Sequence, residues 1–176
     1  MNKLSQKEKD AIREAIALNE LSSEHRVILS QMLGTDDDVI KDVELFVDGA
    51  ADLHSKTAGI GGVIYSEGSE IFSFAHPLLD KTNNEAEYLS MIQGIKASLD
   101  LNIRKLNIFS DSELIVKQIN GEYKLKNPRM FALNQTVFTY LNQLELWSVS
   151  HVRRELNVRA DELSKIGMQE AKNSKK

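Results

Sequence analysis

The order of the hydrophobic patterns after residue 42 is the feature that most constrains the fold of this 176-residue chain. Three segments, 43–48, 58–66 and 70–78, have the composition and spacing of β-strands, and the short connection EGS at 67–69 predicts a hairpin between the last two. Helical and strand-like patterns then alternate toward the C-terminus. Hairpin-connected strands followed by alternating helices and strands predict an α/β domain, with a mixed sheet that has helices on its faces.

The alternating part of the chain supplies the remaining strands and the long helices. The expected elements are helices at 84–99, 112–120, 128–143 and 158–170, and strands at 105–110 and 145–152. The predicted sheet therefore has five strands. In sheets of this kind, binding and catalytic sites form where the ends of strands meet the starts of helices.

Residues 1–41 are predicted to form a separate helical appendage and linker. Amphipathic patterns predict helices at 5–18 and 22–33, with LSSE at 21–24 as a capping box. GTDDD at 34–38 fits a C-cap glycine followed by a charged linker. A helical hairpin of this size is too small to be stable alone. We expect it to pack on the main domain, to associate with a second copy, or to bind a protein partner.

The main domain is expected to span 42–170, followed by a polar tail at 171–176. The chain has no cysteine, which excludes disulfides, zinc-thiolate sites and thiol nucleophiles. No apolar run approaches the roughly 18 residues of a membrane span. The N-terminal residues also lack the apolar middle of a secretory signal. We therefore expect a cytoplasmic protein without a membrane partner.

The charge distribution is more informative than the net charge of −4, which by itself argues weakly against a nucleic-acid binder. Residues 42–120 carry 6 positive and 12 negative charges, whereas residues 121–165 carry 7 positive and 5 negative charges. An acidic part followed by a mildly basic part suits a carboxylate metal site beside a phosphate-binding surface. The same imbalance is also common on ordinary protein surfaces, so it does not decide between these two explanations.

Four carboxylates occur where predicted strands end or predicted helices begin. They are Asp48 in FVDGA, Glu87 in TNNEAEY, Asp111 in FSDSE and Asp161 in NVRADELS. Hard divalent cations such as Mg²⁺ prefer oxygen ligands, and a few carboxylates together with water and phosphate can hold them. Two such ions about 3.5–4 Å apart can promote the in-line displacement of a phosphoryl group.

Each of these carboxylates also has an ordinary explanation. Asp48 precedes a glycine and could belong to a turn, and Asp111 lies between serines and could cap a helix. Asp161 could interact favourably with the dipole of the last helix, and Glu87 could be a solvated helix residue. Each signal is weak when taken separately. Their order along one chain is much more specific.

Four segments resemble the type 1 ribonuclease H family, whose fold also occurs as a domain of retroviral reverse transcriptases. They are FVDGA, TNNEAEYLSMIQGI, IFSDSELIVKQINGEYKLKNP and HVRRELNVRADELS, and the similarity runs from about Val43 to Met168. The resemblance implies a ribonuclease H-like fold in the compact form of bacterial and archaeal members. It also implies an endonuclease that hydrolyses the RNA strand of RNA–DNA hybrids and leaves 5′-phosphate and 3′-hydroxyl ends. The implied ligands of two Mg²⁺ ions, or Mn²⁺, are Asp48, Glu87, Asp111 and Asp161.

The same resemblance suggests residues that contact the hybrid. Asn83, Asn84 and Glu113 occupy positions expected to lie near the cut, and Thr82 is a candidate for a DNA-phosphate contact. An asparagine amide both donates and accepts hydrogen bonds, as recognition of a 2′-hydroxyl requires. The alternative for the residues at 82–84 is helix capping, with Glu85 completing a capping box.

A second group of candidates flanks the last strand and the loop before the fourth helix. Many members of the family carry a histidine on a flexible loop between the fifth strand and the last helix. In this sequence the segment HVRRELNVRAD leaves little room for that loop. Arg153, Arg154 and Asn157 are expected to take over part of the role of that histidine. His151 is interpreted as a strand-edge residue, with an auxiliary catalytic group as the alternative. The further candidates for hybrid binding, with a solvated loop as the alternative, are Lys124 and Lys126.

Two other functions remain open at this stage. The domain could be a non-catalytic nucleic-acid-binding module, or a nuclease with a broader substrate range that includes double-stranded RNA. The N-terminal residues 1–41 contain no Phe, Trp or Tyr and carry 6 positive and 8 negative charges. They are therefore not expected to bind the hybrid, because they can supply neither stacking nor net phosphate neutralisation.

Overall fold

The computed structural model describes residues 6–17, 21, 25–26, 28–29, 32 and 43–175. The chain divides into two compact units, Met1–Ile40 and Lys41–Lys176. In the first unit, α1 spans Gln6–Ala17, and the Arg26 side chain donates hydrogen bonds to the carbonyl oxygens of Leu21 and Ile16.

Several predicted features of the first unit cannot be compared with the structure. Residues 22–24 of the expected capping box and the expected linker at 34–38 lie outside the described residues. Residues 25–26, 28–29 and 32, which fall within the second predicted helix, are helical. Within the described part of the chain, no helix has both the length and the apolar character needed to cross a membrane.

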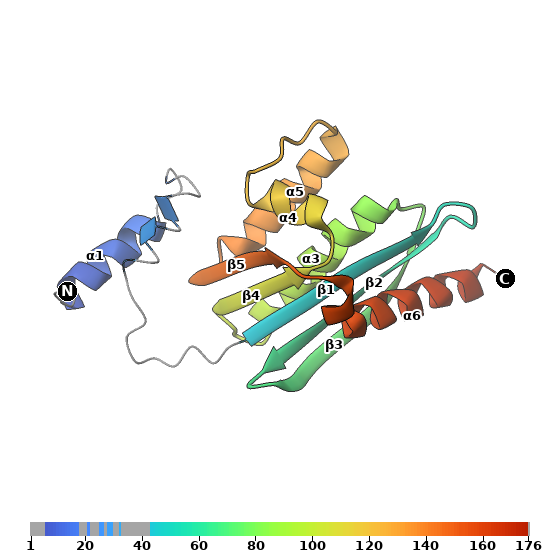
Figure 1. The fold of residues 1–176 in the computed structure, drawn as a ribbon, viewed down its shortest axis with the longest axis horizontal. Helices are drawn as coiled ribbons and strands as arrows, with labels where there is room; N and C mark the ends of the chain where they lie inside the picture. The colour runs from blue at the N-terminus through green and yellow to red at the C-terminus, as the bar shows by residue number, and fades with distance from the viewer. Residues whose placement is uncertain are drawn as a thin grey trace. The chain divides into compact units, whose positions relative to one another are not determined.

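The second unit contains an open, five-stranded mixed sheet, as the sequence predicts (Figure 1). Its strands are β1 (Val43–Asp52), β2 (Thr57–Ser66), β3 (Ser69–Leu79), β4 (Lys105–Ser110) and β5 (Leu146–His151). The strand order is β3-β2-β1-β4-β5. The first three strands pair antiparallel through hairpins, and β4 and β5 join in parallel. Strands β1 and β4 are therefore neighbours that run in the same direction.

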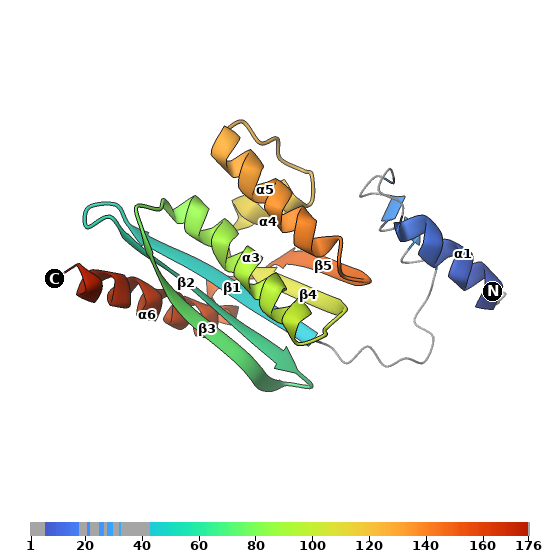
Figure 2. The same ribbon diagram turned by 180° about the vertical axis from the view of Figure 1, so that it is seen from behind.

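Helices cover both faces of the sheet. They are α3 (Asn83–Asp100), α4 (Glu113–Ile119), α5 (Pro128–Leu141) and α6 (Val158–Ser174). Figures 1 and 2 show α3, α4 and α5 on one face and α6 alone on the other. The larger hydrophobic core lies beneath the three helices and includes Leu45, Val47, Tyr88, Ile95 and Ile108. The predicted capping box at the start of α3 is confirmed, because Thr82 and Glu85 exchange both hydrogen bonds.

Two predicted boundaries were wrong. Strand β1 does not end at Asp48 but continues to Asp52, because its pairing with β2 is unbroken as far as Thr57. Helix α6 continues to Ser174 rather than ending at 170. The reason is tertiary, since Ala171 is buried and the Lys172 ammonium lies 3.0 Å from the Asp52 carboxylate. The first turn of the expected polar tail is therefore part of the folded domain.

Glycines allow both helix layers to approach the centre of the sheet closely. A Cβ atom on Gly61 would lie 2.2 Å from the backbone nitrogen of Ser164 in α6. A Cβ atom on Gly49 would lie 2.3 Å from the backbone nitrogen of Glu87 in α3. Gly49 follows Asp48 in β1, and Gly61 is paired with Asp48 across the sheet. Because Gly49 and Gly61 have no side chains, α3 and α6 can both pack close to Asp48.

Replacing Gly61 with alanine is expected to lower the free energy of unfolding by about 3 kcal/mol, because the added methyl group would overlap the α6 backbone. Gly68 is a matched control, since a Cβ atom there meets nothing within 4 Å. Asparagine tolerates the positive φ of Gly68, so Gly68→Asn should cost less than about 1 kcal/mol. Urea denaturation followed by circular dichroism measures both changes, and equal losses would contradict the packing explanation.

Candidate metal centre

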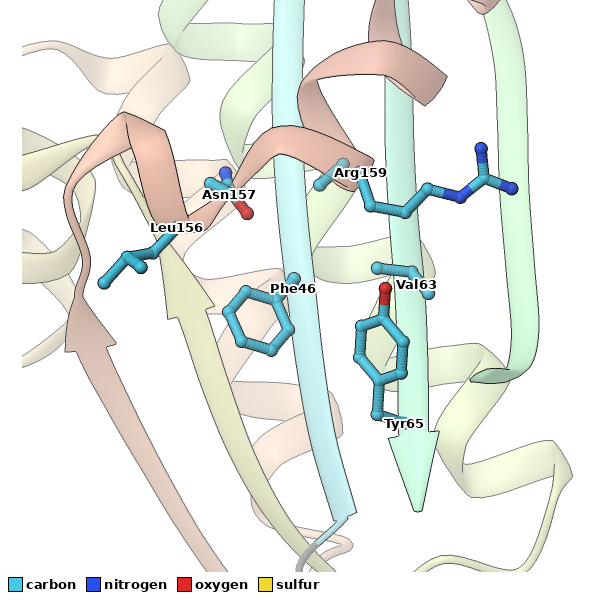
Figure 3. Close-up of a pocket in the computed structure, with 7 residues that line it drawn as sticks. Phe46, Val63, Tyr65, Leu156, Asn157 and Arg159 are labelled. Carbon is cyan, nitrogen blue, oxygen red and sulfur yellow. The ribbon is translucent and has the colours of Figure 1, made fainter. Parts of the chain in front are cut away.

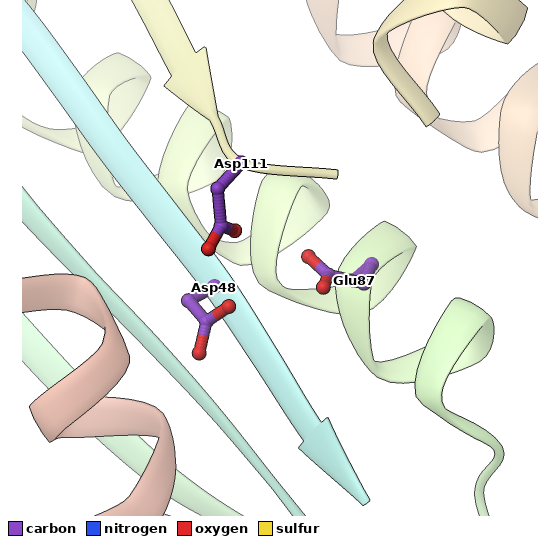
Figure 4. Close-up of side chains that lie close together, drawn as sticks. All are labelled: Asp48, Glu87 and Asp111. Carbon is purple, nitrogen blue, oxygen red and sulfur yellow. The ribbon is translucent and has the colours of Figure 1, made fainter. Parts of the chain in front are cut away.

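Three carboxylates that are distant in sequence meet at one point of the second unit. Asp48 projects from the middle of β1, Glu87 from the start of α3, and Asp111 from the residue after β4 (Figure 4). One oxygen atom from each carboxylate lies within 4.8 Å of the others. Because β1 and β4 pair in parallel, Asp48 and Asp111 lie side by side. Because α3 packs on β1, Glu87 lies next to them.

The ordinary explanations for Asp48 and Asp111 do not hold in this structure. Asp48 is paired with Gly61 inside a continuous strand, so it is not a turn residue. The N-cap residue of α4 is Ser112 rather than Asp111. The Asp111 carboxylate instead points toward Asp48, as Figure 4 shows.

Burial and mutual repulsion make ionisation of the cluster unfavourable. Asp48 and Glu87 are each only 6% exposed. Burial, together with the neighbouring charges of Asp48 and Asp111, raises the pKa of Glu87 to about 9. Burial also raises the pKa of Asp48 to about 6, with a hydrogen bond from Ser164 acting in the opposite direction. Without a cation, the cluster therefore holds protons that ordinary carboxyl groups would lose.

Asp161, the fourth predicted ligand, is placed differently. It lies in the first turn of α6, close enough for its charge to raise the pKa of Asp48, but it is not part of the three-residue cluster. Its carboxylate is 2.5 Å from the Arg154 guanidinium and 2.5 Å from the Lys165 ammonium. Although burial raises the pKa of Asp161, these two partners lower it below its ordinary value.

Two polar side chains fasten the cluster to the start of α6. Asn157 is 1% exposed, and its amide nitrogen donates to the Val47 carbonyl at 3.0 Å and to Asp111 Oδ1 at 3.3 Å. Asn157 therefore positions a carboxylate from inside the domain, whereas the sequence placed it among the candidates for hybrid binding. The Ser164 hydroxyl donates to Asp48 Oδ2. Ser164 was not predicted from the sequence; the one signal for it is a small polar residue one turn after Asp161.

A separate pocket lies on the α6 face of the sheet. Figure 3 shows Asn157 at this pocket, together with Phe46, Val63, Tyr65 and Leu156. The lining is mainly apolar and includes none of the four carboxylates. This pocket therefore does not contribute ligands to the cluster.

The residues of the cluster fit a hard divalent cation. Glu87 Oε2 is buried and has no hydrogen-bond partner among the described residues. No lysine or arginine in the described part of the chain forms an ion pair with Asp48, Glu87 or Asp111. A buried carboxylate is stable only when it is paired, protonated or bound to a metal. Three converging carboxylates with an unpaired oxygen form a donor set suited to Mg²⁺ or Mn²⁺.

The predicted hybrid-binding residues other than Asn157 lie on the surface. Asn83 and Asn84 are exposed in the first turn of α3, next to the capping residue Thr82. Glu113 is exposed and forms an ion pair with Lys117 at 2.6 Å.

The remaining surface candidates flank β5 and the loop before α5. His151 is the last residue of β5 and is exposed, as expected for a strand-edge histidine. The other exposed candidates are Lys124, Lys126, Arg153 and Arg154.

Comparisons with known proteins agree with this fold. A family model described as reverse transcriptase-like matches residues 46–167, more than half of the chain. The ribonuclease HI of Halobacterium salinarum is 28% identical over 130 residues, which cover 73% of this chain and 65% of that protein. The solved N-terminal RNase H domain of Rv2228c from Mycobacterium tuberculosis has a TM-score of 0.73 at 26% identity, covering 77% of this chain and 99% of that one.

A further solved structure is similar over the same region. LC11-RNase H1, determined in complex with RNA/DNA hybrid, has a TM-score of 0.69 at 29% identity, covering 74% of this chain and 99% of that one. The chain spans about two thirds of the Halobacterium protein, and the matched region is 37% of the bifunctional protein Rv2228c. The family match begins at residue 46, so it does not include the N-terminal unit.

With a chelator present, Glu87→Gln is expected to raise the free energy of unfolding by about 2 kcal/mol at about pH 8 and by much less at about pH 4. The carboxyl group of Glu87 has a higher pKa in the folded protein than its ordinary value of 4.5. The folded state therefore binds more protons than the unfolded chain between these pH values, and stability falls as the pH rises toward 9. Glutamine has no charge to bury and removes this loss.

Urea denaturation at several pH values, in EDTA, measures the difference. Glu145→Gln is the matched control, because Glu145 is exposed on the surface. It should change stability little at any pH. A gain for Glu87→Gln that is equal at both ends of the pH range would show that burial of the charge is not its cause.

Proposed function

Because the chain belongs to the type 1 ribonuclease H family, we propose that it is a metal-dependent endonuclease that hydrolyses the RNA strand of RNA–DNA hybrids. The observation that carries this proposal is the meeting of three carboxylates, of which Asp48 and Glu87 are buried, with no ion pair to a lysine or arginine among the described residues. The hybrid as substrate is supported by the complex of LC11-RNase H1 with RNA/DNA hybrid. The proposed products have 5′-phosphate and 3′-hydroxyl ends.

The proposed ligands of two Mg²⁺ ions, or of Mn²⁺, are Asp48, Glu87 and Asp111, together with Asp161. When bound, such ions activate a water molecule and stabilise the leaving oxygen of an in-line displacement. The chain itself holds three of the carboxylates together and keeps Asp48 and Glu87 largely away from bulk water. Asp161 can join them if its ion pairs with Arg154 and Lys165 are replaced by contacts with a metal ion. The side chains of Arg154 and Lys165 are both exposed, so they can move away.

Selectivity for the hybrid is proposed to come from surface groups beside the cluster. Asn83 and Asn84 are exposed at the start of the helix that carries Glu87, so their amides can meet 2′-hydroxyls close to the carboxylates. Thr82 at the start of α3 and Glu113 at the start of α4 are further candidates. Arg153 and Arg154 precede α6 and can contact phosphate oxygens.

The basic loop before α5 is proposed to contact the strand of the hybrid that is not cut. Lys124 and Lys126 are exposed there, and Tyr123 is half exposed with the Lys117 ammonium 5.0 Å from its ring centroid. Lysines on a mobile stem bind phosphates as point charges. Contacts of this kind make affinity strongly dependent on salt and supply no sequence preference.

The proposal also covers the roles of the two parts of the chain and the compartment. The catalytic activity is proposed to lie in residues 42–170, and residues 1–41 to mediate self-association or to bind a protein partner. The proposed compartment is the cytoplasm.

Asp111→Asn is expected to reduce the cleavage of an RNA–DNA hybrid by about 100-fold or more, because it removes a charged ligand at the centre of the cluster. Asp100→Asn, at the exposed end of α3, is the matched control and should keep full activity. The assay compares the hybrid, an RNA duplex and a DNA duplex, with Mg²⁺, Mn²⁺ or chelator. Full activity of Asp111→Asn, or activity in chelator, would contradict the proposal, and cleavage of the RNA duplex would show a broader substrate range.

Hybrid binding by the inactive Asp111→Asn protein is expected to weaken steeply as salt concentration rises. Adding Lys126→Ala should reduce the slope of log affinity against log salt by about 1, since one phosphate contact is lost. Lys96→Ala, on the exposed side of α3, is the control and should leave the slope unchanged. Fluorescence anisotropy of a labelled hybrid measures the slopes, and a flat salt response would argue against the basic loop as the binding surface.

A further inference from the structure

Ser164 connects two of the elements that carry the carboxylates. It lies in α6, one turn after Asp161, and it is completely buried. Its hydroxyl donates to Asp48 Oδ2, and its oxygen lies 2.9 Å from the carbonyl oxygen of Asp161. A hydrogen bond to an ionised carboxylate is shorter and stronger than one between neutral groups. Ser164 therefore fastens the side chain of a β1 residue to the first turns of α6.

The two oxygens of Asp48 are used for different purposes. Figure 4 shows one oxygen directed toward Asp111 and Glu87, and the other directed toward the neighbouring helix α6. The oxygen that accepts from Ser164 is Oδ2. An aspartate side chain can rotate about two bonds, and repulsion from the Asp111 carboxylate favours rotation away from the cluster. The bond from Ser164 opposes that rotation.

The position of the Ser164 backbone is itself set by packing. Gly61 lies opposite Asp48 in the β1–β2 pairing, and a Cβ atom on it would be only 2.2 Å from the Ser164 nitrogen. The backbone of α6 at Ser164 therefore rests directly on β2 beside Asp48. Because the backbone that carries the hydroxyl is held in place, a carboxylate that rotates outward moves away from its donor.

We propose that Ser164 is a positioning residue for the metal centre: its hydroxyl holds Asp48 so that one carboxylate oxygen faces Glu87 and Asp111, ready to bind a divalent cation. The inference rests on the proposed function, because it assumes that the cluster binds cations. It adds a residue that does not itself act as a ligand. Groups that orient metal ligands typically change metal affinity by about 10–100-fold when they are removed.

The test measures cation binding directly. Titration calorimetry with Mn²⁺ on the full-length protein, without nucleic acid, should show an approximately 10-fold higher Kd for Ser164→Ala than for the parent. Ser164→Cys keeps a weak donor of similar size and should give an intermediate Kd. Ser98→Ala is the matched control, because Ser98 is also buried in a helix and donates to the Gly94 carbonyl far from the cluster. Its Kd should equal that of the parent.

Other outcomes distinguish the inference from the proposed function. Unchanged Mn²⁺ affinity in Ser164→Ala, with affinity lost in Asp111→Asn, would overturn the role of Ser164 while leaving the metal centre intact. A parent protein that binds no Mn²⁺ would overturn both. Equal weakening by Ser98→Ala and Ser164→Ala would also overturn the inference, since a general loss of helix packing would then explain the result. Thermal unfolding of each variant confirms that the compared proteins are folded.

Discussion

The crowding of three carboxylates, two of them buried, is the constraint on which the rest of this structure depends. Asp48, Glu87 and Asp111 offer oxygens within 4.8 Å of one another, in a place that water reaches poorly. Nothing in their own chemistry holds them there, so the surrounding fold must. The parallel pairing of β1 and β4 and the glycine contacts of Gly49 and Gly61 with two helices provide that rigid frame.

Among the described residues, Asp161 is the member of the acidic site that forms ion pairs with basic side chains. Asp161 is paired with Arg154 and Lys165, and these contacts lower its pKa. Asp48 and Glu87 have raised pKa values instead, because burial dominates their environment. This contrast supports the proposal that the site binds cations from solution. Among the described residues, Asp48, Glu87 and Asp111 have no ion-pair partner, although the charge of Arg154 lowers the pKa of Asp48 and Glu87 to some extent.

Sequence patterns predicted the elements well where local chemistry determines them. The capping exchange between Thr82 and Glu85 depends on four neighbouring residues, and it was predicted from them. Predictions failed where distant contacts decide the outcome. Asp48 lies within β1 because β2 continues to pair beyond it, and α6 is extended by contacts of its last turn with the β1–β2 hairpin. Asn157 is buried because it bridges Val47 and Asp111, which are remote from it in the chain.

The sequence by itself determined the five strands, the order of the helices and the residue types of the acidic site, because hydrophobic period and side-chain chemistry are local properties. Only the tertiary structure decided which carboxylates meet. It brought three of them together and paired Asp161 with Arg154 and Lys165, and it placed Ser164 against Asp48. The physical reason is that these contacts arise from how α6 and α3 pack on the sheet, and close packing is set by the shape of residues far apart in the chain.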